Sequence, residues 1–111
     1  MALTPEAKVK AAVKKVLDQY EVYHFSPPAN GYGRVGIPDI ICCVNGYFVA
    51  IECKAGKGKT TTLQDRELAG IIKAGGVALV INEDGVDSLH HLITTIKKRH
   101  AHNAYAIDVR L

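Results

Sequence analysis

Two apolar, β-type runs joined by Asn45-Gly46 constrain the fold of this chain more than any other feature. They cover residues 39–44 and 47–53. Asn-Gly between such runs is the strongest short signal for a two-residue type I′ turn, so the pattern predicts a β-hairpin. Because both faces of the two strands are largely apolar, we expect them at the centre of a sheet that is covered on both sides.

The segments around the hairpin alternate between helical and strand patterns. Thr4-Pro5 is typical of a helix start, and Thr61 to Gln64 resembles a capping box. We expect helices over residues 5–20, 61–74 and 86–99, short strands over 22–25 and 77–82, and a last edge strand over 104–109. With no linker and no internal repeat, this order predicts a single α/β domain over residues 1–111.

Composition sets limits on the class of protein. The chain has 111 residues, 48% of them hydrophobic, which is enough for one core. Its formal net charge of +3 permits a nucleic-acid partner without arguing for one. Three cysteines lie in apolar runs without CxxC spacing, which is typical of reduced, buried thiols. No signal peptide and no apolar run of about 20 residues is visible, so we expect a cytoplasmic protein without a membrane partner.

The predicted turn also fixes which residues of the two strands face each other. If Asn45 and Gly46 form the turn, then Asp39 lies directly opposite Glu52. Facing residues of an antiparallel pair project to the same side, about 4.5–5.5 Å apart at Cβ. Two carboxylates so placed repel, and each raises the pKa of the other. A divalent cation such as Mg²⁺ removes the repulsion and turns the pair into a chelate.

Lys54 lies two residues beyond Glu52 and therefore projects to the same face. A bound metal, a positioned water and a nearby ammonium group are the parts needed to hydrolyse a phosphodiester. The alternative is that Asp39 is only a turn residue after Pro38, while Glu52 and Lys54 form an exposed strand end. The facing carboxylates in an otherwise apolar hairpin favour an active site.

These residues resemble a known motif. Gly36-Ile37-Pro38-Asp39, a hairpin and then Glu52-Cys53-Lys54 resemble the PD-(D/E)xK nuclease superfamily, and within it the stand-alone VRR-NUC domains of bacteria and their viruses. Leu63-Gln64, just after the lysine loop, matches a glutamine of that family. The resemblance covers almost the whole chain. It implies a restriction-endonuclease-like α/β fold, with an αβββαβ core and a central mixed sheet flanked by helices.

The resemblance also implies roles for individual residues. Asp39 and Glu52 would be metal ligands with the backbone carbonyl of Cys53, and Lys54 the catalytic lysine. Glu21 matches the acidic residue that many members carry on the first helix, where it binds metal directly or through water. A carboxylate near a helix end is, alternatively, only solvated. Gln64 would contact the lysine or the substrate, although a capping role explains it equally well.

Candidate DNA-binding residues lie in two Gly-containing loops. Arg34 could reach a phosphate and Tyr32 could stack on a base, while Lys57 and Lys59 could contact phosphates beside the site. The alternatives are local packing for Tyr32 and a solvated loop for the lysines. The lysine loop resembles a P-loop, but that pattern requires glycine where this chain has Cys53.

The function we expect is that of a Mg²⁺- or Mn²⁺-dependent DNA endonuclease. Similarity to Holliday-junction resolvases implies a homodimer that cuts four-way junctions, with a role in DNA repair and recombination in a bacterial cytoplasm, where a phage could encode it. Two alternatives remain open. The chain could cut flaps, single strands or duplex nonspecifically, or it could bind DNA without cutting it.

Overall fold

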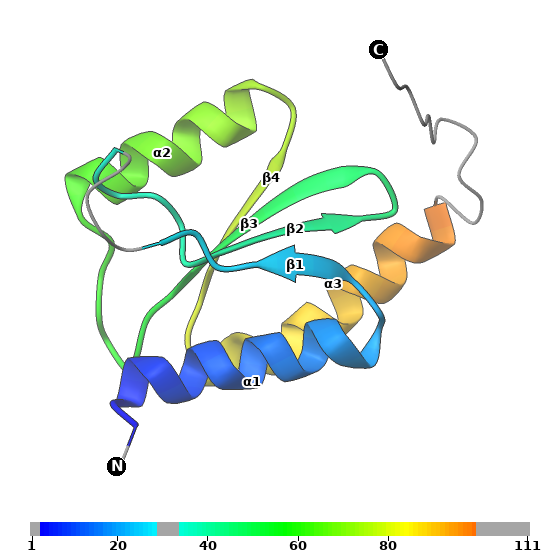
Figure 1. The fold of residues 1–111 in the computed structure, drawn as a ribbon, viewed down its shortest axis with the longest axis horizontal. Helices are drawn as coiled ribbons and strands as arrows, with labels where there is room; N and C mark the ends of the chain where they lie inside the picture. Colours follow the sequence, from blue (N-terminus) through cyan, green and yellow to red (C-terminus); the bar gives the residue numbers. More distant parts are fainter. Residues whose placement is uncertain (1–2, 29–33, 100–111) are drawn as a thin grey trace.

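The computed structural model describes residues 3–28 and 34–99, so Tyr32 and the edge strand predicted over 104–109 lie outside the described residues. Within them the order of elements is helix, three strands, helix, strand, helix (Figure 1). They are α1 (Pro5–Gln19), β1 (Tyr23–Phe25), β2 (Ile40–Val44), β3 (Tyr47–Cys53), α2 (Thr62–Lys73), β4 (Val77–Ile81), the 3₁₀ turn η1 (Glu83–Gly85) and α3 (Val86–Arg99). None of these helices is both long and apolar enough to span a membrane.

The four described strands form one mixed sheet in the order β1-β2-β3-β4. The first three are antiparallel neighbours, and β4 runs parallel to β3 after the crossover through α2. The hairpin strands β2 and β3 therefore occupy the two central positions, as the apolar pattern predicts. The α/β class, the αβββαβ order and the mixed sheet are all confirmed.

The hairpin turn has the geometry that its sequence requires. Asn45 and Gly46 both have positive φ, at 47° and 89°, which is the signature of a type I′ turn. The pairing that follows runs from Val44 opposite Tyr47 to Ile40 opposite Ile51. The predicted register is confirmed over the whole strand pair, and its continuation brings Asp39 opposite Glu52.

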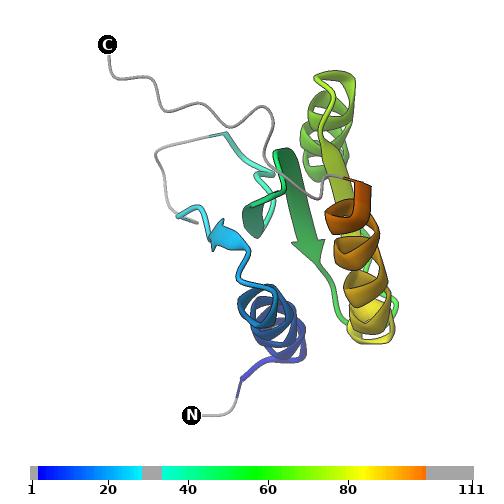
Figure 2. The same ribbon diagram turned by 90° about the vertical axis from the view of Figure 1, so that its right-hand side faces the viewer.

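Helices α1 and α3 pack side by side across one face of the sheet (Figure 2). Thr4 caps α1 by accepting a hydrogen bond from the amide of Ala7, and Pro5 occupies the first helical position. The apolar side chains of both helices meet alternate residues of the strands. The buried core comprises Val9, Val13, Val16, Leu17, Val22, Ile40, Cys42, Val44, Val49, Ile51, Cys53, Ile81, Leu89, Ile93 and Ile96.

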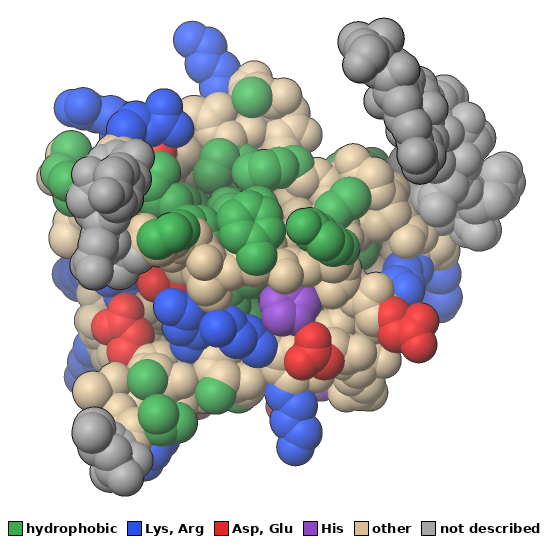
Figure 3. Space-filling view, viewed as in Figure 1, with side chains coloured by type: hydrophobic (Ala, Val, Ile, Leu, Met, Phe, Trp, Pro, Cys, Tyr) green, Lys and Arg blue, Asp and Glu red, His purple; other side chains and the backbone are tan. Residues whose placement is uncertain are grey.

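The other face of the sheet is covered only in part, which differs from the sequence-based expectation. Helix α2 packs against β4, but it leaves the aromatic side chains of β1 and β3 accessible. Tyr23 is 74% exposed and Phe48 is 49% exposed. Figure 3 shows hydrophobic side chains gathered on the surface beside α2. An apolar strand pattern cannot distinguish a face covered by a helix from one left open, so the pattern alone predicted too much cover.

Candidate active site

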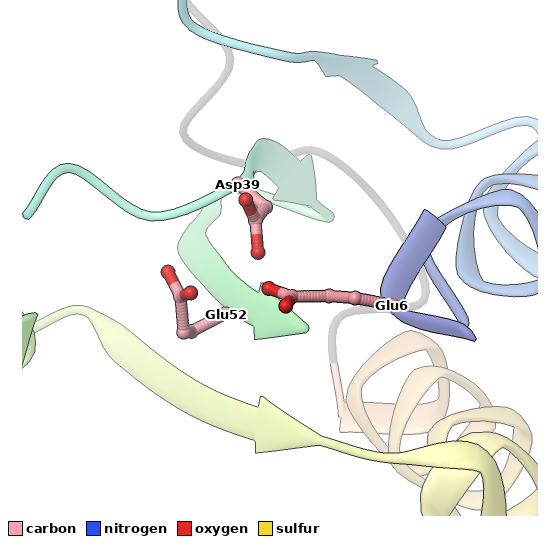
Figure 4. Close-up of side chains that lie close together, drawn as sticks. All are labelled: Glu6, Asp39 and Glu52. Atoms are coloured by element: carbon pink, nitrogen blue, oxygen red, sulfur yellow. The ribbon is translucent and has the colours of Figure 1, made fainter. Parts of the chain in front are cut away.

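The hairpin register brings two carboxylates together at the end of the sheet where β2 begins and β3 ends. Asp39 precedes β2 and Glu52 is the penultimate residue of β3. Glu6, from the first turn of α1, joins them, and one carboxylate oxygen of each residue lies within 4.8 Å of the others. Figure 4 shows the three side chains pointing toward one another from three different elements. We call this group the acidic cluster.

Glu52 is the buried member of the acidic cluster. Only 2% of the residue is exposed, although it is charged in its ordinary state. Its Oε2 accepts a hydrogen bond from Gln64 Nε2 at 3.0 Å and lies 3.6 Å from the ammonium of Lys54. Its Oε1 is also buried and has no hydrogen-bond partner among the described residues. A buried carboxylate oxygen without a partner is costly, which points to a group that binds there.

The pKa of the Glu52 carboxyl is raised from 4.5 to about 7 by burial and by the neighbouring Asp39, while Lys54 opposes the shift. The order of these causes matters. Desolvation of the charged form is the largest cause of the raised pKa, and repulsion from the facing carboxylate is the second largest. The predicted repulsion is therefore present, but it adds to a larger effect that the strand pattern did not indicate.

Asp39 is fixed by the backbone of the facing strand. Its Oδ2 accepts a hydrogen bond of 2.8 Å from the amide of Cys53, which ties the start of β2 to the end of β3. Its Oδ1 lies 4.0 Å from the ammonium of Lys10 on α1. Each carboxylate of the hairpin pair thus has its own lysine. The Lys10 contact was not predicted, because nothing local in the sequence relates α1 to the hairpin.

Cys53 contributes its backbone to the site and its side chain to the core. Its side chain is fully buried in the core, and this burial is the main cause that raises the pKa of its thiol to about 12. The N–H and C=O of one residue in a strand point to the same side. Because its amide binds Asp39, the carbonyl of Cys53 is directed toward the acidic cluster, where the sequence resemblance expects a metal ligand.

Glu21, the acidic residue expected on the first helix, does not join the acidic cluster. It follows the end of α1 at φ 55°, with its amide bonded to the carbonyl of Asp18, while the amide of Val22 bonds to that of Leu17. These two bonds form a Schellman motif with Glu21 in the left-handed position. Its side chain is exposed. Glu21 thus terminates the helix, and the expectation that it lies beside Asp39 and Glu52 is corrected: Glu6 is the acidic residue of α1 that lies there.

The topology explains this correction. Strand β1 is antiparallel to β2, with Tyr23 opposite Cys43 and Phe25 opposite Ile41, so β1 starts near the hairpin turn and ends near Asp39. Glu21 precedes β1, which puts it at the far end of the sheet, roughly 20 Å from Asp39 at about 3.3 Å per residue. Helix α1 runs from the site to this far end of the sheet, so its N-terminus lies at the site. An acidic residue in the first turn of this helix is the signal that could have identified Glu6.

Gln64 has the capping role that the sequence offered and, in addition, a contact with Glu52 that the sequence did not predict. Its Oε1 accepts a hydrogen bond of 2.9 Å from the amide of Thr61, and its own amide donates to Thr61 Oγ1, which completes the capping box of α2. Its Nε2 donates to Glu52. The contact is with the carboxylate rather than the lysine. The start of α2 thereby holds the buried acid in place.

Gly36 lets the loop before Asp39 lie against the start of α2. Its φ is +92°, and an added Cβ would come within 2.7 Å of the backbone carbonyl of Leu63. Only glycine fits that conformation and that space. The glycine in the Gly-Ile-Pro-Asp segment therefore has a packing reason, which is to bring Asp39 and Gln64 to the same site.

Of the predicted DNA-binding residues, Arg34, Lys57 and Lys59 lie in the described part of the chain, outside the acidic cluster. Arg34 is exposed and donates to Glu67 of α2 at 3.0 Å. Lys57 and Lys59 are exposed in the loop between β3 and α2. That loop is anchored where the amide of Gly56 bonds to the carboxylate of Glu83, at 2.8 and 3.1 Å.

The acidic cluster fits a hard divalent cation. Carboxylate and carbonyl oxygens are the donors that Mg²⁺ and Mn²⁺ prefer. The short distances between the three carboxylates also suit a bound cation. So does the buried Oε1 of Glu52, which has no hydrogen-bond partner among the described residues. Asp39, Glu52, Glu6 and the Cys53 carbonyl are the groups that could hold such an ion.

Comparison with solved structures gives the class of fold. A structure described as a VRR_NUC domain matches with a TM-score of 0.69, covering 80% of this chain and 97% of that one at 22% identity. A second, described as a VRR_NUC domain protein, matches with a TM-score of 0.63, covering 88% and 91% at 24% identity. The fold is therefore that of the VRR_NUC nuclease domains, as the motif predicts.

Sequence comparison then places the chain in a family. A relative described as "Putative nuclease p44", from Acyrthosiphon pisum secondary endosymbiont phage 1, is 34% identical over 68 residues, which are 60% of this chain and 69% of the relative. The family model described as archaeal Holliday junction resolvase (Hjc) matches residues 13–111. The chain belongs to this family and is a nuclease. Glu6 precedes the matched region, so its place in the site comes from the structure.

Proposed function

We propose that this chain is a Mg²⁺- or Mn²⁺-dependent DNA endonuclease that cuts branched DNA, with the four-way junction as its preferred substrate. One observation carries the metal dependence: three carboxylates converge, and the buried one has an oxygen without a hydrogen-bond partner in the described part of the chain. In a fold that serves only to bind DNA, this arrangement would repel the phosphates and destabilise the protein. Metal-assisted phosphodiester hydrolysis explains it.

Asp39 and Glu52 hold the metal in this proposal, with Glu6 and the carbonyl of Cys53 completing the protein's share of the ligands. When bound, a divalent cation supplies Lewis acidity toward the phosphate. The protein orients the two carboxylates that would hold this ion. Cys53 fixes Asp39 through its amide, and Gln64 fixes Glu52 through its side chain. Neither carboxylate has to be repositioned when substrate arrives.

Lys54 acts on the nucleophile in this proposal. Its ammonium lies 3.6 Å from Glu52 Oε2, and its side chain is only 13% exposed. It positions the attacking water and offsets the negative charge that grows on the phosphate. Water forms a new bond to phosphorus as the bond to the leaving sugar oxygen breaks, and that oxygen takes up a proton.

A homodimer acting on four-way junctions is the finer part of the proposal. The family description names Holliday junction resolvases, and resolving such a junction requires two cuts in opposed strands. A second copy of the chain would supply the second active site. The exposed aromatic side chains on the open face of the sheet are apolar surface of the kind that interfaces bury. DNA repair and recombination are the processes in which such an enzyme would act.

The basic residues around the cluster would hold the DNA backbone. Arg34 lies in the segment before Asp39, and Lys57 and Lys59 lie in the loop that follows Lys54; all three are exposed, so they could contact phosphates beside the cut. All three cysteines are free thiols, which is typical of a reducing compartment such as the cytoplasm. We propose that the enzyme acts there, where it meets DNA.

The test is cleavage of labelled four-way junction, flap and linear duplex, each with Mg²⁺, with Mn²⁺ and with EDTA. We expect symmetric cuts on the junction with either metal and none with EDTA. Asp39→Asn, Glu52→Gln and Lys54→Met should each lower the rate by at least about 100-fold while circular dichroism shows a folded protein. Lys15→Met, which removes an exposed lysine from α1, is the control.

Other outcomes identify the alternatives. Cleavage of every substrate at similar rates would replace the junction-specific enzyme by a flap-cutting, single-strand or nonspecific nuclease. Binding to the junction without cleavage in either metal would leave a DNA-binding module and would overturn the proposed catalysis. Sedimentation of the protein in solution tests the homodimer separately.

A further inference from the structure

A groove of about 320 Å³ opens directly beside the acidic cluster. Asp39 and Gln64 line it, so an occupant would lie next to the proposed metal site. Its volume falls at the small end of the range for sites that bind compact ligands, about 300–1,000 Å³. Stacked base pairs cannot enter a hollow of this size, whereas one nucleotide that has left the stack can.

Six of the ten residues that line the groove are proline, glycine or aliphatic. They comprise Pro27, Pro28, Val35, Gly36, Ile37 and Pro38. Such walls offer packing surface to the flat face of a base or to a deoxyribose without selecting a particular base. Contact of this kind, combined with positive charge along the backbone, is how proteins bind unpaired nucleic acid with little sequence preference.

Two cations complete the lining of the groove. Lys10 comes from α1 and Arg34 from the segment before β2. The ammonium of Lys10 is 4.0 Å from Asp39 Oδ1 and its side chain is 35% exposed, so it is free to contact a phosphate as well. Arg34 uses its Nε for Glu67, while its side chain remains 80% exposed. A guanidinium has five donors, so most of them stay available.

Lys10 adds positive charge on the Asp39 side of the site. The acidic cluster carries up to three negative charges, which Lys54 and a bound divalent cation would together balance. Lys10 would then give the Asp39 side a net positive charge, which favours the approach of a phosphate. The mechanism described above gives Lys10 no task, although it is the lysine nearest to Asp39 in the described part of the chain.

We propose that this groove holds one unpaired nucleotide of the substrate, next to the phosphate that is cut. Lys10 and Arg34 bind its phosphate, and the apolar walls receive its base or sugar. The inference rests on the proposed nuclease function and names its substrate class more closely. The substrate must present an unpaired nucleotide beside the cut, as bulged and single-stranded DNA do, and as a four-way junction does when a base pair at its branch point opens. A continuous duplex does not.

The experiment compares a short linear duplex with the same duplex carrying one bulged thymidine. Binding is measured by fluorescence anisotropy with Ca²⁺ in place of Mg²⁺. Wild type should bind the bulged DNA about tenfold more tightly, the size expected for contacts to charged groups. Lys10→Met should reduce this preference to less than about threefold and leave the duplex affinity nearly unchanged. Lys15→Met makes the same charge change on the same helix and should keep the preference.

Arg34→Met provides a second variant in case Lys10→Met does not fold, and it should lower the preference in the same direction. Equal binding of the two DNAs by wild type would overturn the proposal, as would equal weakening of both by Lys10→Met. Cleavage with Mg²⁺ is scored separately. A preference that depends on Lys10 in a protein that does not cut would support the groove while the proposed catalysis fails.

Discussion

The two ends of helix α1 each carry a glutamate with an unusual environment, and the two environments differ in kind. Glu6, in the first turn, lies within 4.8 Å of two other carboxylates. Glu21, just beyond the last turn, has a left-handed backbone at φ 55° and an exposed side chain. Near Glu6 the arrangement is electrostatically unfavourable, because carboxylates lie close together and the charge of Glu52 is buried. At Glu21 the cost is conformational and falls on the backbone.

The difference teaches how an acidic residue on this helix should be assigned. From the sequence, Glu21 was the candidate because it matches the acidic residue that many members of the resembled family carry on the first helix. The topology instead places Glu6 at the site. Because β1 is antiparallel to β2, the C-terminal end of α1 lies at the far end of the sheet and its N-terminus lies at the site. Several carboxylates that repel one another at one place indicate a functional site. A single left-handed residue after a helix is explained by the way the helix ends.

The largest expected effect on stability concerns the acidic cluster near Glu6 in the absence of metal. The pKa of Glu52 is raised to about 7, so the native state binds a proton more tightly than the unfolded chain does. Its contribution to stability is therefore present below pH 4.5 and is lost as the pH rises toward 7. We expect a decrease on the order of 3 kcal/mol across this window, measured by urea unfolding with EDTA present.

Glu52→Gln is the matching variant, because glutamine keeps the shape of the side chain and has no proton to lose. Its unfolding free energy should vary less with pH than that of wild type over the same window. Addition of Mg²⁺ at pH 8 should stabilise wild type and leave the variant nearly unchanged. An identical pH dependence in both proteins would show that Glu52 is not the group that titrates.

A smaller effect should separate the two glutamates in catalysis. Glu6→Gln should lower the cleavage rate or the metal affinity by about 10–100-fold, as removal of a supporting ligand typically does. Glu21→Gln should change both by less than about twofold, because its carboxylate lies at the other end of the sheet. Initial rates measured over a Mg²⁺ titration check this. The reverse ranking would restore Glu21 as the ligand.

The smallest effect concerns the backbone at the far end of α1. Glu21→Gly should raise the unfolding free energy by about 1 kcal/mol, because glycine adopts the left-handed conformation without the penalty of a Cβ. Glu21→Ala removes the same carboxylate and keeps the Cβ, so it should change stability little. Equal stability of the two variants would mean that the charge of Glu21, and not its backbone, determines the effect.

Local signals account for what the sequence could predict. Asn45-Gly46 determines the turn and therefore the pairing of Asp39 with Glu52, and Thr61 to Gln64 determines where α2 begins. Glu6 and Lys10 could not be found in the same way, because their place in the site depends on how α1 crosses the sheet. The burial that raises the pKa of Glu52 was likewise invisible, since it comes from packing between distant segments.

The side chain of Gln64 has a consequence for which amino acids the position tolerates. Glutamate completes a capping box as well as glutamine does. Here, however, Oε1 is committed to the amide of Thr61, so the other terminal atom must face Glu52. Glutamate would present an acceptor where a donor is needed and would bring a fourth carboxylate to the cluster. The helix cap alone would tolerate glutamine or glutamate at this position, but the neighbouring Glu52 favours glutamine.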